Sequence, residues 1–131
     1  MKILILEDDI KTISRLMNAI ELLQKRYQEK DFAVSVLAEY TQVEDYLNTA
    51  DKNIFDIILL DRDCHACGSF HCLDFSKYPV EKIIAISSVP SYNEEVKKLG
   101  VSRVVHKDFQ NMEVFIHGVI QHIEEMVENN D

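Results

Sequence analysis

Acidic residues directly follow two apolar segments of the sequence. Residues 55–61 are mostly apolar, and the run ends at Asp61. Residues 2–6 are equally apolar and are followed by Glu7 and Asp8. Both runs are too short to span a membrane and too evenly apolar for a surface strand, so we expect central strands of a parallel sheet. Such sheets bind ligands beyond the carboxyl ends of their strands, where these acids stand.

A hydroxyl and an ammonium group are expected at the same rim. Ser87 follows the mostly apolar residues 82–86, and Lys107 comes shortly after residues 101–105. Three carboxylates at one rim repel each other unless a cation is present, and Mg²⁺ typically uses one or two carboxylates, waters and phosphate. With Mg²⁺, Asp61 can attack a phosphoryl group and carry it as an acyl phosphate. Metal, lysine and serine suit the charge on the transferring group.

Strand-like and helix-like segments alternate five times along the chain. The expected strands are residues 2–6, 34–37, 55–61, 82–86 and 101–105. The first expected helix follows the acids after residue 6 and runs to about Tyr27. Two further helices begin at capping boxes over residues 41–44 and 91–94, and the second of them ends at Gly100. A short helix is expected within residues 69–76, and the last helix covers residues 111–127. Such alternation predicts βαβ units. We expect one flavodoxin-like, doubly wound (βα)₅ three-layer domain over residues 1–131, with a parallel sheet of order 2-1-3-4-5.

Charge and composition exclude several classes of partner. The 131 residues carry a net charge of −9, which disfavours binding to nucleic acid or to an anionic membrane. The sequence has neither a membrane-length apolar stretch nor a signal-peptide layout, so we expect a cytoplasmic protein. An odd cysteine count of three argues against a disulfide framework.

The ordered set of strand-end motifs resembles the receiver domain of two-component response regulators, the CheY-like family. The resemblance rests on residues 5–9, 55–61, 86–88 and 105–109, in family order and spacing, and covers essentially the whole chain. Each motif alone is weak, whereas the ordered set is specific. It implies a stand-alone receiver, because the chain ends with the last expected helix and has no output domain.

The resemblance implies how a phosphoryl group is handled. Asp61 would be the phosphoacceptor, Ser87 would bond a phosphoryl oxygen, and Lys107 would pair with the phosphate. A histidine kinase or phosphotransfer protein would be the donor. The chemistry would be limited to self-phosphorylation and autodephosphorylation, so the protein is not expected to be an enzyme in the ordinary sense.

The resemblance also implies a magnesium site. Asp8 and Asp61 would bind Mg²⁺ directly, and Glu7 would act through a water. The backbone carbonyl of Asp63 would add a further ligand.

The signal is expected to leave through a protein target. By resemblance, the target would bind the face made by residues 91–99, residues 101–105 and the last helix. Receiver activation couples the movement of the residue at Ser87 to an aromatic ring on the fifth strand. Val104 occupies that position here. The switch positions are therefore Ser87 and Val104, and the usual aromatic switch is in doubt.

The loop after Asp61 is rich in cysteine and histidine. Its candidate soft ligands are Cys64, His65, Cys67, His71 and Cys72. Cys-x-x-Cys is a familiar zinc half-site, but a second half-site at a usual spacing is missing. Packing is the favoured interpretation, with a Zn²⁺ site or a redox sensor as alternatives.

Two other functions compete with the receiver. Asp61 and Asp63 match the Asp-x-Asp nucleophile motif of haloacid-dehalogenase-like phosphatases, in which the second acid is a general acid/base. That motif usually lies on the first strand, and here an acid pair precedes it. The second competitor is a pseudo-receiver, a phosphorylation-independent binding module gated by metal or redox chemistry in the loop of residues 64–72.

Overall fold

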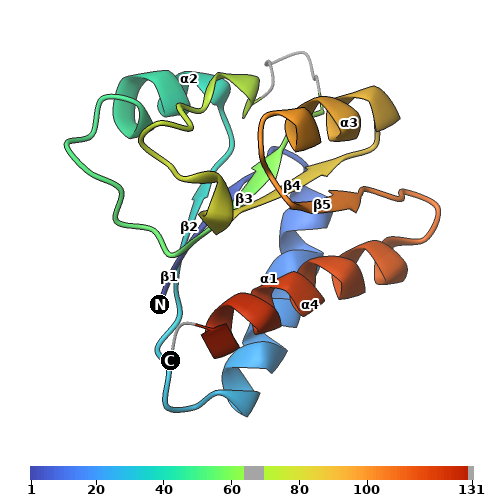
Figure 1. Cartoon of the computed structure of the whole chain (residues 1–131). Coiled ribbons are helices and arrows are strands. Elements are labelled where there is room, and N and C mark those ends of the chain that lie inside the picture. Colours follow the sequence, from blue (N-terminus) through green and yellow to red (C-terminus); the bar gives the residue numbers. More distant parts are fainter. Residues whose placement is uncertain (64–69, 130–131) are drawn as a thin grey trace.

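The computed structural model describes residues 1–63 and 70–129, which form a five-stranded parallel sheet between two layers of helices (Figure 1). The strands are β1 (Lys2–Leu6), β2 (Ala33–Leu37), β3 (Ile57–Asp61), β4 (Ile83–Ser87) and β5 (Arg103–His106). Their order across the sheet is β2-β1-β3-β4-β5, and every pairing is parallel. The predicted doubly wound fold is confirmed.

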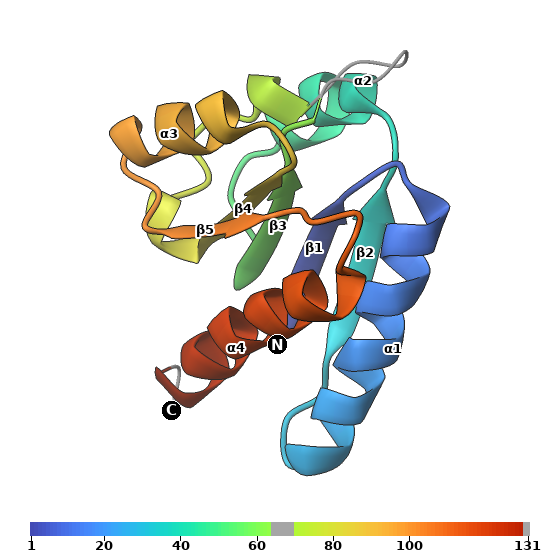
Figure 2. The ribbon, with the colours of Figure 1, turned by 90° about the vertical axis from the view of Figure 1, so that its right-hand side faces the viewer.

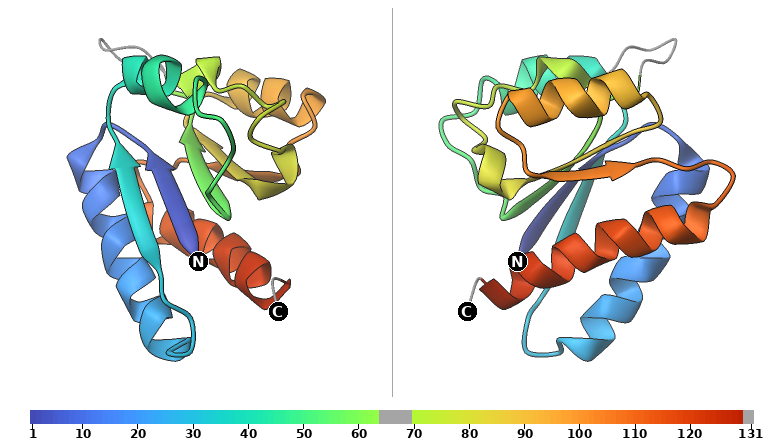
Figure 3. Two further views of the ribbon diagram at one scale, coloured as in Figure 1. Left: turned by 90° about the vertical axis from the view of Figure 1, so that its left-hand side faces the viewer. Right: turned by 45° about the vertical axis from the view of Figure 1, so that its right-hand side comes forward.

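The two faces of the sheet are covered differently. The long helices α1 (Ile10–Arg26) and α4 (Met112–Asn129) pack on one face, as Figure 2 shows. The opposite face carries shorter elements (Figure 3). They are α2 (Tyr40–Gln42), a π-helical turn (Val43–Leu47), two 3₁₀ turns (Phe70–Cys72 and Val80–Lys82) and α3 (Pro90–Lys98). No helix in the described ranges is long and apolar enough to cross a membrane.

The core consists of two apolar layers, one on each face of the sheet. Alternate residues of β1 serve the two layers: Ile3 and Ile5 pack with α1 and α4, and Leu4 and Leu6 with the shorter elements. The strands β3 and β4 are buried along their whole length. This explains their nearly continuous apolar sequence, because a central parallel strand faces helices on both sides.

Both predicted capping boxes are wrong in position. The segment α2 begins at Tyr40, and its reciprocal pair is Glu39 with Gln42, whose side chain accepts a hydrogen bond from the Glu39 N–H (3.1 Å). The helix α3 begins at Pro90. Proline suits the first helical position because its ring fixes φ and it has no N–H to satisfy.

Other boundaries also differ from the sequence prediction. The turn after α3 uses Gly100 at φ +107°, as predicted, but the Val101 N–H then bonds to the Val96 carbonyl (3.2 Å). Because Val101 closes the helix, β5 begins only at Arg103. The helix expected within residues 69–76 is a 3₁₀ turn in the described part of that segment, Phe70–Cys72.

Candidate functional site

Four strands bring their carboxyl ends to one rim of the sheet. Glu7 directly follows β1, Asp61 ends β3, Ser87 ends β4, and Lys107 directly follows β5. The register pairs Asp61 with Ile86 and Ser87 with His106, so neighbouring strands end at nearly the same level. The topology thereby brings together side chains up to 100 residues apart in sequence.

The centre of the rim is a buried ion cluster of Glu7, Asp61 and Lys107. The Lys107 ammonium donates to both carboxylate oxygens of Glu7, at 3.0 and 2.9 Å. Its distance to Asp61 Oδ2 is 3.5 Å. The Lys107 and Glu7 side chains are inaccessible to solvent, as is Asp61 almost completely. Lys107 therefore forms hydrogen bonds with the Glu7 carboxylate and a longer ion pair with Asp61.

Asp61 is held in an environment that opposes its negative charge. Its Oδ1 accepts a hydrogen bond from the Asp63 N–H (3.0 Å), whereas its buried Oδ2 has no hydrogen-bond partner. Burial, and next the negative charge of Glu7, raise the pKa of Asp61 from 3.8 to about 8, against the lowering effect of Lys107. Without a further cation, this carboxyl is substantially protonated at neutral pH.

The acids fit a divalent cation. Carboxylate oxygens of Glu7, Asp8 and Asp61 lie within 4.8 Å of one another. These are hard oxygen donors of the kind that Mg²⁺ prefers, and the buried Asp61 Oδ2 offers an oxygen without a hydrogen bond. The neighbouring Asp9 instead caps α1 by accepting from the Thr12 N–H (3.1 Å). The structure thus distinguishes the helix cap, Asp9, from the candidate metal ligands Glu7 and Asp8, which the sequence alone does not.

The side chain of Asp63 turns toward β4. Its Oδ1 accepts from the Ser87 hydroxyl (2.6 Å) and from the Ser88 N–H (2.8 Å), and its Oδ2 accepts from the Ser88 hydroxyl (3.0 Å). From the sequence, Asp63 is expected to supply a backbone carbonyl to the metal and, in the phosphatase alternative, a carboxylate that acts as general acid/base, whereas no role is expected for the Ser88 side chain. A second hydroxyl directly after Ser87 was the available signal.

These contacts bear on the phosphatase alternative. In that mechanism Asp63 would exchange a proton with a substrate. Here three donors from β4 and the residue after it engage the Asp63 carboxylate, which is 5% exposed. This arrangement holds the loop rather than offering a general acid/base to a substrate.

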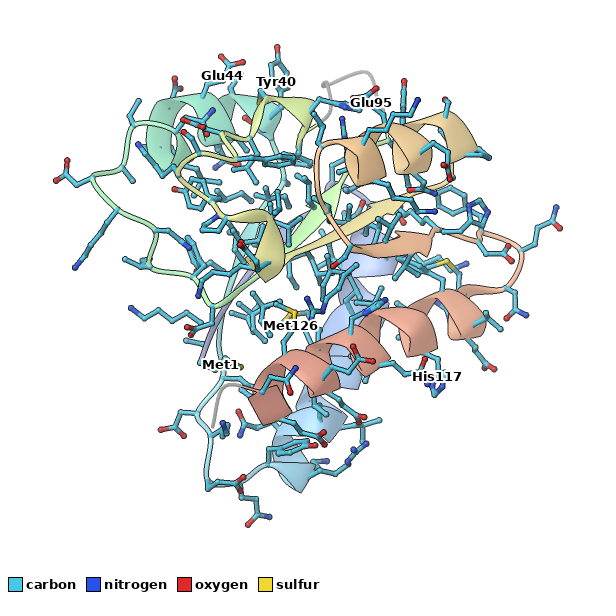
Figure 4. All side chains as sticks on the ribbon, in the orientation of Figure 1. Met1, Tyr40, Glu44, Glu95, His117 and Met126 are labelled. Atoms are coloured by element: carbon cyan, nitrogen blue, oxygen red, sulfur yellow. The ribbon has the colours of Figure 1, made fainter. Side chains whose placement is uncertain are left out.

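A buried arginine lies between the two aspartates and connects the rim to α3. The Arg62 side chain is 3% exposed and donates to Glu95 Oε1 (2.6 Å) and, through Nε, to His71 Nδ1 (3.1 Å). The His71 ring also meets Tyr92 edge-on, with centroids 4.8 Å apart. Figure 4 shows Glu95 on α3, on the same side of the sheet as Tyr40. Sequence reasoning did not find this cluster.

The described residues include His71 and Cys72 of the cysteine- and histidine-rich loop. Cys64, His65 and Cys67 lie outside the described residues. His71 is bonded by Arg62, and the Cys72 thiol lies 3.9 Å from the Tyr40 carbonyl, to which it donates. Burial raises the pKa of the Cys72 thiol, which disfavours a reactive thiolate. Within the described ranges, neither residue belongs to a cluster of metal-ligand type.

Val104, predicted to occupy the switch position, lies on β5 opposite Ala85 of β4. It is partly buried and packs against the apolar layer under α3. Valine is stiff at χ1 and has no ring to rotate between two positions. Any coupling between the rim and the side of the sheet that carries α3 therefore depends on other contacts, such as those of Arg62.

Comparison with solved structures identifies the fold. The chain is similar to the bacteriophytochrome response regulator AtBRR, with a TM-score of 0.60, 19% identity and coverage of 95% of this chain and 91% of that one. It is also similar to the response regulator TrrA from Thermotoga maritima, solved in complex with Mg²⁺-BeF, with a TM-score of 0.55, 17% identity and coverage of 95% and 97%.

These similar structures are response regulators, and the chain has the fold of their receiver domains. The resemblance seen in the sequence is confirmed at this level. Models of protein families give no match to this sequence, and neither do the sequences of curated proteins. The identity to the solved structures is too low to transfer more than the fold.

Proposed function

We propose that this protein is a phosphorylation-dependent signalling receiver that takes a phosphoryl group on Asp61. The main support is the environment of that carboxylate at the end of β3. Its Oδ2 is buried without a hydrogen bond, lies 3.5 Å from the Lys107 ammonium and belongs to the cluster with Glu7 and Asp8. An oxygen that lacks a partner in the resting protein can form a new bond without losing an old one.

Glu7, Asp8 and Asp61 would hold a Mg²⁺ ion, with the Asp63 carbonyl as the proposed backbone ligand. A bound Mg²⁺ would offset the repulsion between these acids and the charge on a transferring phosphoryl group. The charge of a cation favours the ionised form of Asp61, whose pKa is otherwise raised to about 8. Dependence on a divalent cation thus follows from the electrostatics of the acids themselves.

In the proposed transfer, an ionised Asp61 oxygen attacks the phosphorus of a phosphohistidine on a kinase or phosphotransfer protein. The O–P bond forms as the P–N bond breaks, and the leaving imidazole keeps the electron pair and takes up a proton. Lys107 and Ser87 face the phosphoryl oxygens and stabilise their charge. In this proposal, the only other reaction of the protein is hydrolysis of the acyl phosphate on Asp61.

The signal would pass to a protein target at the face made by α3, β5 and α4. The new phosphoryl charge competes with Glu7 for the Lys107 ammonium, and it draws on the donors of the loop after β4. That loop leads directly into α3. A change at Asp61 thereby reaches the proposed output face.

A phosphorylation-independent binding module is the second candidate. One observation favours it: Ser87 is already bonded to an anionic group, the Asp63 carboxylate, without any phosphate. In this case the target complex would be equally tight with and without acetyl phosphate. For the receiver, phosphorylation would change the affinity.

The deciding experiment is intact-mass measurement after incubation with acetyl phosphate and Mg²⁺. We expect one phosphoryl adduct on the wild type, none on Asp61→Asn and none in EDTA. Asp51→Asn is the matched control, because Asp51 is an exposed acid in the loop before β3 and its loss changes the charge equally. A folded wild type without an adduct, or a labelled Asp61→Asn variant, would overturn the proposal.

A further inference from the structure

The carboxylate of Asp63 occupies a set of converging donors beside the phosphoacceptor. The Ser87 hydroxyl, the Ser88 N–H and the Ser88 hydroxyl all donate to it, at 2.6, 2.8 and 3.0 Å. The Asp63 residue is only 5% exposed. Two hydroxyls and a backbone amide that point at one buried anion form an anion-binding site, here filled by the protein itself.

This anion-binding site lies where a group on Asp61 would reach. Asp61 pairs with Ile86 in the sheet, and Ser87 is the next residue of β4. The Arg62 N–H bonds to the Ile86 carbonyl (2.9 Å), so the chain continues beside β4 up to Asp63. A phosphoryl group on Asp61 needs anion-binding donors from this neighbouring strand end, and the carboxylate already uses them.

We propose that Asp63 is a tethered competitor: its carboxylate occupies the Ser87 and Ser88 donors and must leave them before a phosphoryl group on Asp61 can be bound. This inference rests on the proposed receiver function and adds a regulating residue to it. Two anions cannot share these donors closely, because like charges repel and each donor hydrogen is used once. Asp63 therefore lowers the affinity of the site for the phosphoryl group.

The same contact fixes the loop after β4 in the absence of phosphate. The Ser87 hydroxyl also accepts from the Val89 N–H (2.9 Å), and the Ser87 carbonyl accepts from the Asn93 side chain on α3 (3.2 Å). The loop is thus held from both sides while Asp63 is bound. Phosphorylation exchanges one anion for another at Ser87 instead of making the first contact there.

The test is a titration with beryllofluoride, a phosphoryl analogue, in the presence of Mg²⁺, followed by NMR of the Ser88 amide. Hydrogen bonds to a charged group are worth enough for about a tenfold change in affinity. We expect Asp63→Ala to bind beryllofluoride about tenfold more tightly than the wild type, with Asp63→Asn in between. Asp51→Asn, with the same charge change at a distant exposed position, should bind like the wild type.

A second variant tests the route through the serines. Ser88→Ala removes a donor that both anions would use and leaves the backbone N–H, so its affinity for beryllofluoride should stay within about twofold of the wild type, in contrast to Asp63→Ala. Without metal or beryllofluoride, the Ser88 amide proton should move upfield in Asp63→Ala because its charged acceptor is gone. This second measurement depends on no ligand.

The outcomes separate this inference from the function on which it rests. A wild type that binds beryllofluoride, with a folded Asp63→Ala variant that binds it equally well or more weakly, overturns the competition alone. If neither wild type nor variants bind beryllofluoride, the receiver function itself is wrong, and the competition is rejected with it.

Discussion

Asp61 and Asp63 are two residues apart, yet their carboxylates lie in opposite environments. Asp61 has one oxygen without a hydrogen bond, and Glu7 adds a second negative charge to its surroundings. Asp63 has both oxygens bonded, to three donors from Ser87 and Ser88. Both are buried. The two carboxylates differ in the hydrogen bonds that the protein donates to them, and not in their burial.

This contrast separates two tasks that a buried carboxylate can perform. A buried carboxylate with an oxygen that lacks a hydrogen-bond donor is costly in the folded protein and gains from a new cation or a new covalent bond. A carboxylate with several donors stabilises the segment that supplies them. We therefore propose that Asp61 is the reactive residue and that Asp63 positions the loop, although both lie at the end of the same apolar strand.

The largest effect is expected from removing the ammonium group that lies beside Asp61 and Glu7. Lys107→Met leaves Glu7 and Asp61 buried without their ammonium partner, which should destabilise the fold by about 3–5 kcal/mol. Urea unfolding in EDTA measures this. Lys98→Met, an exposed position at the end of α3, is the control and should change stability by less than about 0.5 kcal/mol. Equal losses for the two variants would mean that the buried pair contributes nothing special.

The next prediction is that the two aspartates have opposite effects on stability. Asp63→Asn should destabilise the protein by about 1–3 kcal/mol, because the Ser87 and Ser88 donors lose a charged acceptor. Asp61→Asn should stabilise it, because an uncharged amide replaces a carboxylate with poor solvation. Urea unfolding at pH 8 in EDTA tests both signs, and a shared sign would remove the distinction between the two sites.

The pH dependence has a definite direction. The folded pKa of Asp61 is about 8, above its usual 3.8, so the folded state holds a proton that the unfolded chain has lost. The free energy of unfolding therefore falls as the pH rises from the unfolded pKa to the folded pKa, and it levels off once the pH has passed the folded pKa. From pH 6 to pH 8 the wild type should lose about 2 kcal/mol more than Asp61→Asn. A parallel pH profile for the two proteins would contradict the raised pKa.

The sequence was sufficient for the fold and for the position of the rim, for a physical reason. Continuous apolar strands and regular alternation allow few topologies, and parallel strands place their carboxyl ends together. Glu7, Asp61, Ser87 and Lys107 are close because of that rule alone. Their roles remain proposals that the phosphorylation experiment tests.

Side-chain direction after the strand end could not be predicted. Spacing does not say whether Asp63 turns toward the proposed metal site or toward β4, because both lie within reach of the same loop. The partner of Arg62 is Glu95, 33 residues away on a helix whose start depends on Pro90. Local patterns specify elements, whereas such pairs depend on how the elements finally pack.

The smallest expected effect concerns Arg62, which lies between the two aspartates. Glu95→Gln removes the charged partner of a guanidinium that is 3% exposed, and leaves its bond to His71. Because Glu95 itself is half exposed, we expect a loss of only about 1 kcal/mol in unfolding free energy. Glu94→Gln is the matched control: it breaks the exposed pair with Lys97 on the same helix and should cost less than about 0.5 kcal/mol.

If both variants cost the same, the Arg62 contact to α3 is an ordinary surface pair. If Glu95→Gln costs more and also shifts the Ser88 amide signal, then the residue between the two aspartates ties their strand end to the proposed output helix.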